Sequence, residues 1–318
     1  MYKISVVVPL YNKADYIGRA LESVLSQTFQ NFEVVVIDDG STDNGAEIVK
    51  NLRDTRIRLL QQSNAGVSAA RNRGFEEGKA DLIAFIDADD EWKPTFLETI
   101  LRLREKYGNA GAYATGYEIK VSSYNIKKLS YKGIPPYPWE GLIPRYFYTA
   151  LSTQPVWSSA VAIPKLIFEK VGGFPVGERL AEDLYMFGKI AIRYSIAFSS
   201  RVEAVYHQDA TNRACKMYSR ERSLFAEYAS LAIKDGQVRK DILADLKEYI
   251  DNDLIFLARK CILLERKPEV ARKILSMCCY GSNFRLEKYF WLFGAMIPNN
   301  IVQLGREFKK RTKGFFVR

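Results

Sequence analysis

The stretch Leu82-Ile83-Ala84-Phe85-Ile86-Asp87-Ala88-Asp89-Asp90 decides how the rest of the chain is interpreted. Its first five residues form an apolar run, short enough to indicate a strand that is buried on both faces of a sheet. Acids follow this strand at once, and a buried carboxylate without a partner is costly. We therefore expect Asp87 and Asp89 to lie at an open edge of the sheet, where a cation can meet them.

Hard divalent cations such as Mg²⁺ and Mn²⁺ take oxygen ligands and commonly bridge to phosphates. The segment is therefore a candidate metal site. The alternative is a solvated acidic turn before a helix, whose N-terminal dipole Asp90 or Glu91 would favour.

The composition indicates a globular protein of one large domain or two ordinary ones, since the chain has 318 residues and 47% of them are hydrophobic. The apolar stretch from Ile4 to Leu10 is too short for a signal peptide. No stretch approaches the roughly 18 apolar residues that a membrane span needs. The four cysteines, Cys215, Cys261, Cys278 and Cys279, show no metal-ligand spacing, which favours a reduced, cytoplasmic setting.

Charge is distributed unevenly along the chain. Residues 1–210 hold 25 basic and 25 acidic side chains, whereas residues 211–318 hold 22 basic and 12 acidic ones and so supply the net charge of +10. A basic C-terminal region could meet an anionic membrane surface or a nucleic acid. No recognised nucleic-acid-binding module accompanies the charge, so we expect no nucleic-acid partner.

The first 120 residues alternate between strand and helix patterns. Strands are predicted at residues 4–9, 33–38, 57–61 and 82–87, and helices at 12–26 (with Asn12 as N-cap), 43–52, 67–77 and after Pro94. This alternation predicts an α/β fold with a doubly wound, mostly parallel sheet, in which ligands bind at the carboxyl ends of the strands. Pro9, Asp38-Asp39 and Asp87-Ala88-Asp89 all lie at such ends.

The remainder is predicted to be organised differently. Residues 121–156 are rich in Tyr, Ser and Pro and predict a long loop. Strands at 157–163, 196–199 and 202–207 and a helix opened by Glu182-Asp183 complete a domain over residues 1–210. Helical patterns dominate from about residue 218, so residues 211–318 form a separate helical, basic region.

Five motifs resemble those of family 2 inverting glycosyltransferases, which have the GT-A fold, and they occur in the family's order over residues 4–207. They are Ser5-Val-Val-Val-Pro9-Leu10-Tyr11-Asn12; Val34-Val-Val-Ile-Asp38-Asp39-Gly40-Ser41-Thr42-Asp43; Asn64-Ala-Gly66-Val-Ser-Ala-Ala-Arg71-Asn72-Arg-Gly74; the DXD-like Asp87-Ala88-Asp89-Asp90; and Val171-Gly172-Gly173-Phe174-Pro175 with Glu182-Asp183. The last hundred residues carry no comparable signature.

The resemblance implies a nucleotide-sugar donor, most simply a UDP-sugar. The implied donor-binding residues are Pro9, Tyr11, Asn12, Asp38, Asp39, Gly40, Ser41, Arg71, Asp87 and Ala88. Tyr11 would stack on the base, and Asp39, positioned by Asp38, would accept a hydrogen bond from a uracil-type N–H. The alternatives are a core aromatic for Tyr11, ordinary turn chemistry for the two aspartates, and a structural ion pair for Arg71.

A divalent metal, Mn²⁺ or Mg²⁺, is implied as the cofactor. Asp89 is the expected direct ligand, with Asp87 nearer to the ribose or a metal-bound water. The metal would act as a Lewis acid for the departing nucleoside diphosphate. His207, the only histidine, is a further candidate ligand, although a lone histidine can equally be a packing or surface residue.

Asp183 is the implied general base for the acceptor hydroxyl, and Glu182 would hold an acceptor hydroxyl. A helix N-terminus is expected to lower the pKa of Asp183 and keep it charged. The alternative is an ordinary acidic first helical turn. Two positions depart from the family pattern: Ala181 replaces the usual glycine, and Lys189 replaces an arginine often found six residues after the aspartate.

Two aromatic groups lie outside these motifs. Tyr137, Trp139, Tyr146, Phe147, Tyr148 and Trp157 lie in or beside the 121–156 loop, where they could bind sugar rings or anchor the loop. The C-terminal Phe290-Trp291-Leu292-Phe293 and Met296-Ile297 precede a basic cluster of Arg306, Lys309, Lys310, Arg311, Lys313 and Arg318. That order is typical of a peripheral membrane anchor, or else of a solvated basic helix end.

The sequence thus predicts a metal-dependent, inverting, hexosyl-type glycosyltransferase. Its acceptor would be a saccharide, lipid-linked at the cytoplasmic face of the plasma membrane, in the assembly of a surface polysaccharide such as a capsule, O-antigen or exopolysaccharide. A nucleotidyltransferase is the alternative enzyme. A catalytically silent nucleotide-sugar-binding protein is the alternative outside enzymes.

Overall fold

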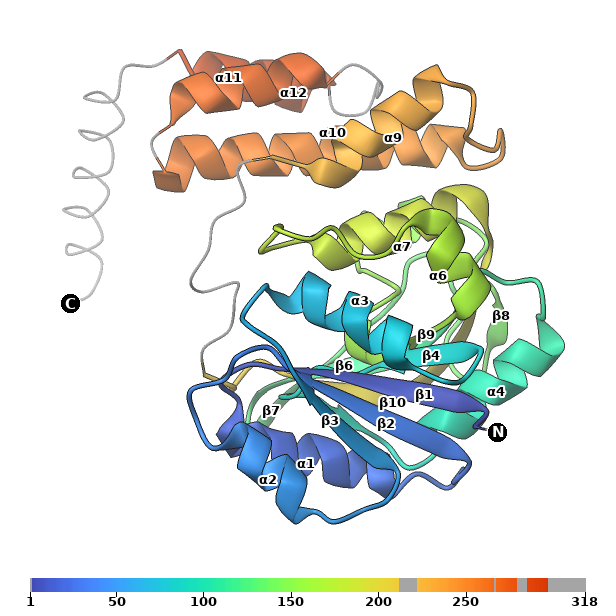
Figure 1. The fold of residues 1–318 in the computed structure, drawn as a ribbon. Helices are drawn as coiled ribbons and strands as arrows, with labels where there is room; N and C mark the ends of the chain where they lie inside the picture. Colours follow the sequence, from blue (N-terminus) through green and yellow to red (C-terminus); the bar gives the residue numbers. More distant parts are fainter. Residues whose placement is uncertain (1, 212–221, 266, 279–284, 297–318) are drawn as a thin grey trace, which may run out of the picture. The chain divides into compact units, whose positions relative to one another are not determined.

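The computed structural model describes residues 2–211, 222–265, 267–278 and 285–296 (Figure 1). The described residues form two compact units. The first takes in everything up to residue 211 together with Gly236–Ile242, and the second takes in residues 222–235 and everything from Leu243 onward. The predicted basic cluster from Arg306 to Arg318 and Ile297 lie outside the described residues.

Ten strands of the described chain form one mixed sheet in the first unit. They are β1 (Ile4–Leu10), β2 (Phe32–Asp38), β3 (Ile57–Gln61), β4 (Leu82–Phe85), β5 (Glu91–Trp92), β6 (Ala112–Ser122), β7 (Asn125–Lys128), β8 (Glu140–Leu142), β9 (Val161–Pro164) and β10 (Ile196–His207). The main order is β3-β2-β1-β4-β9-β6-β10-β5. The predicted α/β class is confirmed, and its physical cause is visible in β1 and β2, which are buried along their whole length.

Most neighbouring long strands are parallel, including β1 with β2, β1 with β4, β2 with β3, and β6 with β10. Strand β9 is the exception, because it lies antiparallel between β4 and β6. Two antiparallel steps restore the direction, so β6 and β10 run the same way as β1 and β4. The carboxyl ends of these strands therefore meet at one edge, which we call the carboxyl edge.

Helices cover both faces of the sheet (Figure 1). They are α1 (Ala14–Leu25), α2 (Gly45–Asn51), α3 (Val67–Glu77), α4 (Phe96–Lys106), α5 (Tyr146–Ala150), α6 (Lys165–Val171) and α7 (Glu182–Arg193), with a 3₁₀ turn at Ser158–Ala160. Helices α1 and α4 share the larger core with Val6 and Val8. The other face packs against α3, whose Ala70 contacts Val35 and Ile37.

Three expectations are corrected. Asn12 is not the N-cap of α1; that position is Lys13, and Asn12 has a φ of 50° with its Oδ1 accepting from the backbone N–H of Thr42 at 2.8 Å. Residues 121–156 are not one long loop, because they contain β7, β8 and α5. The two predicted strands at 196–199 and 202–207 are a single strand, β10, whose register with β6 shifts between Ser199 and Ala204.

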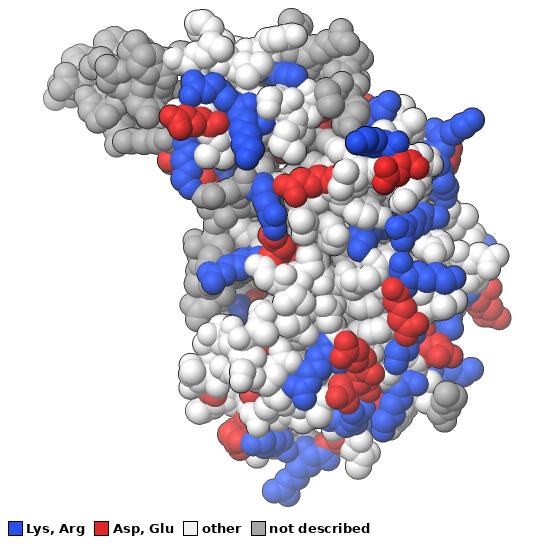
Figure 2. Space-filling view, turned by 45° about the horizontal axis from the view of Figure 1, so that its top comes forward, with Lys and Arg blue, Asp and Glu red and all other residues white. Residues whose placement is uncertain are grey.

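The second unit is helical in its described part, as predicted. It contains α9 (Leu224–Lys234), α10 (Leu243–Lys260), a π-helical turn (Cys261–Glu265), α11 (Pro268–Met277) and α12 (Arg285–Gly294). Helix α10 packs against α9, α11 and α12. Within the described residues, none of the helices combines the length and the apolar character needed to cross a bilayer. On the face drawn in Figure 2, Lys and Arg side chains are interspersed with Asp and Glu.

Candidate active site

The turn after β2 is built on two buried aspartates. Asp39 accepts from the side-chain amide of Gln62 at 2.7 Å and from the backbone N–H groups of Ala65 and Gly66 at 2.9 and 2.8 Å. Asp38 accepts from the Ser41 backbone N–H and from Gln61, both at 3.0 Å. These bonds hold the segment that leads into α3 at the carboxyl edge, which is the turn chemistry that the sequence left as an alternative.

Glycine is required at position 40 in this turn. Its φ is 75°, a left-handed conformation that side-chain-bearing residues rarely adopt. A Cβ there would also lie 3.0 Å from the backbone nitrogen of Asn64. The loops after β2 and β3 can therefore approach each other only because residue 40 has no side chain.

Residues after β1 complete this side of the edge. Pro9 pairs in register with Ile37, and Leu10 with Asp38, so the ends of β1 and β2 lie side by side. The backbone N–H of Asn12 donates to the Ser41 hydroxyl at 3.1 Å. Tyr11 is 47% exposed, so it is not the core aromatic that was the alternative, and its ring is accessible for stacking.

Arg71 joins two acidic segments that are far apart in the sequence. From α3 its guanidinium donates to Asp87 at 2.7 Å and to Glu182 at 2.9 Å, and it lies 5.1 Å from the centre of the Phe174 ring. The side chain is only 3% exposed. Burial by itself would lower the pKa of Arg71, but the two carboxylates raise it above its ordinary value, so the residue stays charged. The DXD-like segment and the start of α7 thus share one cation.

Asp183 sits beside this cluster in the first turn of α7. It is half-buried, and its Oδ1 accepts from the backbone N–H of Leu184 at 2.7 Å. The prediction that the helix N-terminus lowers its pKa is wrong. Burial, followed by the neighbouring charge of Glu182, raises the pKa of Asp183 to about 7, and these effects outweigh the opposite influence of Arg71 and the Leu184 N–H. A carboxylate with a pKa near 7 is a stronger base than an ordinary aspartate.

The acidic side chains of Asp87 and Asp89 in the DXD-like segment contact different basic residues. Asp89 accepts from the ammonium group of Lys13 at 2.6 Å, and its backbone carbonyl accepts from Arg19 at 2.7 Å. Ala88 is buried between the two outward acids. Asp87 contacts Arg71 and remains partly exposed. The sequence did not single out Lys13 or Arg19, since a lone basic residue in the first turns of a helix carries no pattern.

Asp90 is a structural residue rather than a solvated one. It is 1% exposed and accepts from the Ser159 hydroxyl, the Trp157 indole and the backbone N–H of His207. Burial, followed by Asp89 and Asp87, raises its pKa well above the ordinary range. Asp90 therefore ties the DXD-like segment to the end of β10.

His207 is buried, and its ring contacts Glu91 and Asp209 rather than Asp87 and Asp89. Its Nε2 lies 3.2 Å from Glu91 and its Nδ1 lies 3.3 Å from Asp209. Burial, followed by Arg19, lowers its pKa, which favours the neutral ring. In the described part of the chain no three His, Cys, Asp or Glu side chains converge to hold a metal ion, so Asp87, Asp89 and His207 are not a preformed three-ligand set.

The chemistry of this edge still fits a divalent cation. The Lys13 ammonium already occupies a cation position on the Asp89 carboxylate. Mg²⁺ commonly binds to proteins through one or two carboxylates and completes its shell with substrate phosphates and water. Asp87 and Asp89 can supply such a partial set.

Comparison with known proteins decides the family. The model of the family described as "Glycosyl transferase family 2" matches residues 5–169. The chain belongs to glycosyl transferase family 2. The matched range runs from β1 into α6 and contains the ends of β1, β2 and β4. Helix α7 and the end of β10 lie outside it.

Curated relatives of this family 2 chain match its N-terminal part. An uncharacterized glycosyltransferase, YibD of Escherichia coli, is 47% identical over 103 residues, which is 32% of this chain and 30% of YibD. Glycosyltransferase GlyG of Streptococcus pneumoniae is 36% identical over 145 residues, which is 40% of this chain and 48% of GlyG. The match thus spans less than half the length of either relative.

Solved structures confirm the GT-A fold of this family 2 chain. The crystal structure of S. aureus TarS 1–349 in complex with UDP-GlcNAc has a TM-score of 0.71 and 19% sequence identity, covering 92% of this chain and 88% of that one. The complex of the same TarS fragment with UDP has a TM-score of 0.66 and 20% identity. At this identity the likeness shows the fold alone.

Proposed function

We propose that this family 2 protein is an inverting glycosyltransferase that moves a hexosyl unit from a UDP-sugar to a saccharide acceptor. One observation carries the proposal: Arg71 holds Asp87 and Glu182 together at the carboxyl edge. A donor diphosphate and an acceptor hydroxyl must meet at one place, and this ion-pair cluster joins the candidate donor and acceptor segments. The TarS complexes with UDP-GlcNAc and UDP add support for the donor class.

The donor would lie across the ends of β1, β2 and β4. The exposed ring of Tyr11 would stack on the base. The Asp38-Asp39 turn, with Gly40 and Ser41, would line the base and ribose. The Asp39 carboxylate already accepts three hydrogen bonds, and a base N–H would compete with these donors. We therefore assign Asp39 two roles, positioning of the turn and contact with the base.

Asp89 and Asp87 would hold a divalent metal, Mn²⁺ or Mg²⁺, with His207 behind them on the same edge. When bound, the metal supplies Lewis-acid stabilisation of the departing UDP. Lys13 contacts Asp89 at 2.6 Å, so its ammonium would be displaced from that oxygen and would lie near the incoming diphosphate.

Asp183 would act as the general base. Its carboxylate takes the proton of the acceptor hydroxyl while that oxygen attacks the anomeric carbon, and the bond from this carbon to the UDP oxygen breaks. Attack from the face opposite to UDP inverts the anomeric configuration. Glu182, held by Arg71, would fix the acceptor hydroxyl next to Asp183.

The acceptor is proposed to be a growing surface polysaccharide, lipid-linked at the cytoplasmic face of the plasma membrane. The support is the apolar side of α12, where Phe290 and Phe293 are 66% and 68% exposed, together with Met296 just after the helix, which is 65% exposed. Flotation with vesicles containing anionic lipid tests this, since the protein should float with them and a Phe290→Ser, Phe293→Ser variant should not. Failure of the unaltered protein to float would remove the membrane part of the proposal.

A product assay tests the catalytic proposal. With a panel of UDP-sugars and Mn²⁺, the protein should release UDP by slow hydrolysis, and faster once an acceptor is present. Asp183→Asn should reduce transfer by about 10²–10⁴-fold, the range for loss of a general base. Glu47→Gln, on the exposed surface of α2, is the matched control and should leave the rate unchanged.

The same assay separates the other candidate functions. Release of pyrophosphate instead of UDP would identify a nucleotidyltransferase. Binding of UDP-sugars without any turnover, in the presence of every acceptor tried, would identify a silent binding protein. Either result would overturn the proposed transferase.

A further inference from the structure

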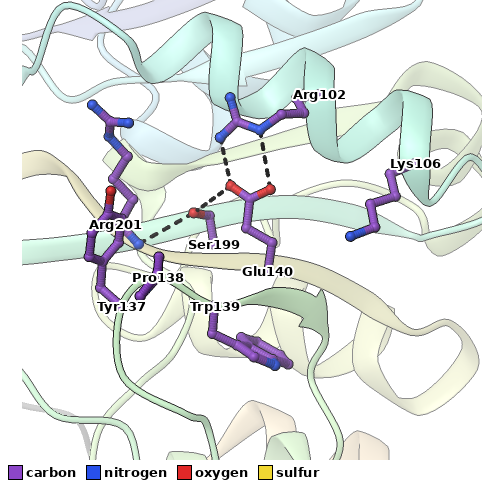
Figure 3. Close-up of a pocket in the computed structure, with 8 residues that line it drawn as sticks. All are labelled: Arg102, Lys106, Tyr137, Pro138, Trp139, Glu140, Ser199 and Arg201. Atoms are coloured by element: carbon purple, nitrogen blue, oxygen red, sulfur yellow. Dashed lines mark hydrogen bonds and ion pairs between the residues drawn. The ribbon is translucent and has the colours of Figure 1, made fainter.

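A pocket lies on the first unit, away from the candidate active site. It has a volume of about 410 Å³ and lies between the second half of α4, the segment that leads into β8, and the first half of β10 (Figure 3). The residues that matter for its chemistry are Arg102, Lys106, Tyr137, Trp139, Glu140 and Arg201. Its size is within the range of small-molecule sites.

This pocket is remote from the carboxyl edge. Its β10 residues, Ser199 and Arg201, lie near the start of the strand, whereas His207 at the end of the strand reaches the carboxyl edge. Because β10 bulges after Ser199, the stretch from Ser199 to His207 pairs with only Thr115 to Lys120 of β6, so at about 3.3 Å per residue Ser199 is roughly 17 Å from His207. A molecule bound here would therefore not be the reacting part of the donor.

The charges of the pocket are unequally compensated. Arg102 and Glu140 neutralise each other in a two-pronged ion pair with distances of 2.6 and 3.2 Å, and the Ser199 hydroxyl donates to the same carboxylate at 3.1 Å. Lys106, by contrast, forms no ion pair with any described residue, and its ammonium lies 5.3 Å from the centre of the Tyr107 ring. Figure 3 shows this ammonium extending toward Glu140.

Arg201 adds a second partly available cation on the other side of Glu140 (Figure 3). Its Nε contacts the buried Glu203 at 2.8 Å, and the side chain is 45% exposed, so part of the guanidinium remains accessible. Arg102 is paired with Glu140 and Arg201 with Glu203, so Lys106 leaves the pocket with a net positive charge. The pocket therefore favours an anionic group over a neutral one.

Two aromatic side chains provide the apolar surface. Tyr137 is 62% exposed, and Trp139 is half-buried with its ring against Gly141, where a Cβ would lie only 2.5 Å from the ring. The Trp139 backbone is fixed to β10, because its N–H donates to the Ser200 hydroxyl at 3.0 Å and its carbonyl accepts from the Ser200 N–H at 2.9 Å. We call Tyr137 and Trp139 the aromatic wall; β10 fixes the backbone of Trp139.

We propose that this pocket is an accessory site for an acidic saccharide, a pyranose ring that carries a carboxylate or a phosphate. The aromatic side chains offer a flat surface for the C–H face of the ring, and Lys106 and Arg201 offer charge-assisted hydrogen bonds to its acidic group. A neutral sugar would leave the cations unused, and a simple anion would leave the aromatic wall unused. The site goes beyond the proposed transfer reaction, since it binds a saccharide without acting on it.

The test is a titration of the full-length protein, without donor or metal, monitored by the NMR signal of the Trp139 indole N–H. The probes are methyl glucuronoside, glucose 6-phosphate, methyl glucoside and inorganic phosphate. We expect saturable shifts with the first two, and binding at least about tenfold weaker for the neutral glucoside and for inorganic phosphate. Comparison of the affinities for methyl glucuronoside and glucose 6-phosphate shows whether the pocket prefers a carboxylate or a phosphate.

Variants separate the two halves of the pocket. Lys106→Gln combined with Arg201→Gln should weaken binding of methyl glucuronoside by about tenfold or more. Tyr137→Ala should also weaken it, and this exposed residue can be replaced with less risk to folding than Trp139. Lys50→Gln on α2, an exposed lysine outside the pocket, is the matched control and should change nothing.

Three results would overturn the proposal. They are the absence of a shift with both acidic sugars, equal binding of the neutral glucoside, and equal binding of inorganic phosphate that is indifferent to Tyr137→Ala. All variants should retain UDP binding, which shows that they are folded. The variant with Arg201→Gln should melt at a lower temperature because buried Glu203 loses its ion-pair partner, whereas Tyr137→Ala should keep its melting temperature. Because UDP binding is measured separately, a negative result in the pocket leaves the proposed transferase intact, and the converse also holds.

Discussion

At the scale of single residues, Asp183 is the side chain whose environment most affects the proposed chemistry. Its pKa is about 7, raised by burial and by Glu182. The base must be deprotonated to work, so we expect kcat/KM to rise with pH and to level off above an apparent pKa of about 7. Glu182→Gln removes the neighbouring negative charge and should move this rising limb to lower pH. Transfer rates between pH 5 and 9 provide the measurement.

The same shift has a consequence for stability that does not depend on turnover. A raised pKa in the folded state means that the folded protein holds the proton more tightly than the unfolded chain. The resulting stabilisation is complete below the ordinary aspartate pKa of about 3.9 and is lost as pH rises through about 7. Asp183→Asn should thus gain stability relative to the unaltered protein between pH 5 and 8. An unchanged difference in unfolding free energy would contradict the raised pKa.

The neighbouring Ala181, one of the two departures from the family pattern, has a strained backbone. It precedes α7 with a φ of 64°, the left-handed conformation that glycine adopts without strain. Such a conformation costs an L-residue about 1 kcal/mol or more, although a glycine also gains entropy in the unfolded chain. We expect Ala181→Gly to raise the free energy of unfolding by roughly 0.5 kcal/mol. Urea denaturation measures it.

A glycine placed within the same helix should have the opposite effect. Ala191 is a buried residue with a helical backbone in α7, and Ala191→Gly should destabilise the protein by about 1 kcal/mol or more. If both glycine variants were destabilising, the left-handed backbone at Ala181 would not be strained by its side chain.

At the scale of elements, the packing of α3 on β1 depends on Gly74. A Cβ at this position would lie 2.3 Å from Val7 Cγ1, which no real side chain tolerates. Gly74→Ala should therefore push α3 away from the sheet and destabilise the protein by about 1–3 kcal/mol. Because α3 carries Arg71, UDP binding should weaken as well. Thermal unfolding and a UDP titration together check this prediction.

Gly108→Ala is the matched control for this helix–sheet contact. It lies in the turn after α4, where a Cβ would meet only the Arg104 carbonyl at an ordinary 3.7 Å. The substitution should be neutral or slightly stabilising, since it reduces the entropy of the unfolded chain. A loss of stability equal to that of Gly74→Ala would show that the contact with Val7 is not the cause.

Sequence patterns predicted elements well where local chemistry dominates. The strands from Ile4, Phe32 and Leu82 are fully buried and largely apolar runs, which leaves no alternative to a covered sheet. Patterns failed where a side chain has a distant partner. Asn12 is a good N-cap by composition, yet its amide oxygen is used by Thr42, thirty residues later in the chain. The approach of Lys13 to Asp89 is equally invisible in the sequence.

At the scale of the whole molecule, topology was the part that patterns could not give. Nothing in Val161–Pro164 shows that β9 runs antiparallel between β4 and β6. The direction matters, because it brings the end of β10, with His207, to the same edge as Asp89. The pKa of Asp183 was misjudged for a related reason, since the helix N-terminus was known from sequence but the burial and the position of Glu182 relative to Arg71 were not.

The last prediction concerns the stability of the complete protein with ligands. A ligand that binds only the folded chain stabilises it, by roughly 2.7 kcal/mol at a hundred times its Kd. UDP with Mn²⁺ should therefore raise the melting temperature more than UDP alone, and removal of the metal with EDTA should abolish the difference. Asp89→Ala should lose the metal-dependent part and keep a shift with UDP alone, because the ring of Tyr11 and the Asp38-Asp39 turn are unchanged. Asp81→Ala, which replaces an exposed acid just before the start of β4, should behave like the unaltered protein. A full Mn²⁺-dependent shift in Asp89→Ala would show that the ion, if it binds, uses other oxygens, and the assignment of the DXD-like segment would then be wrong.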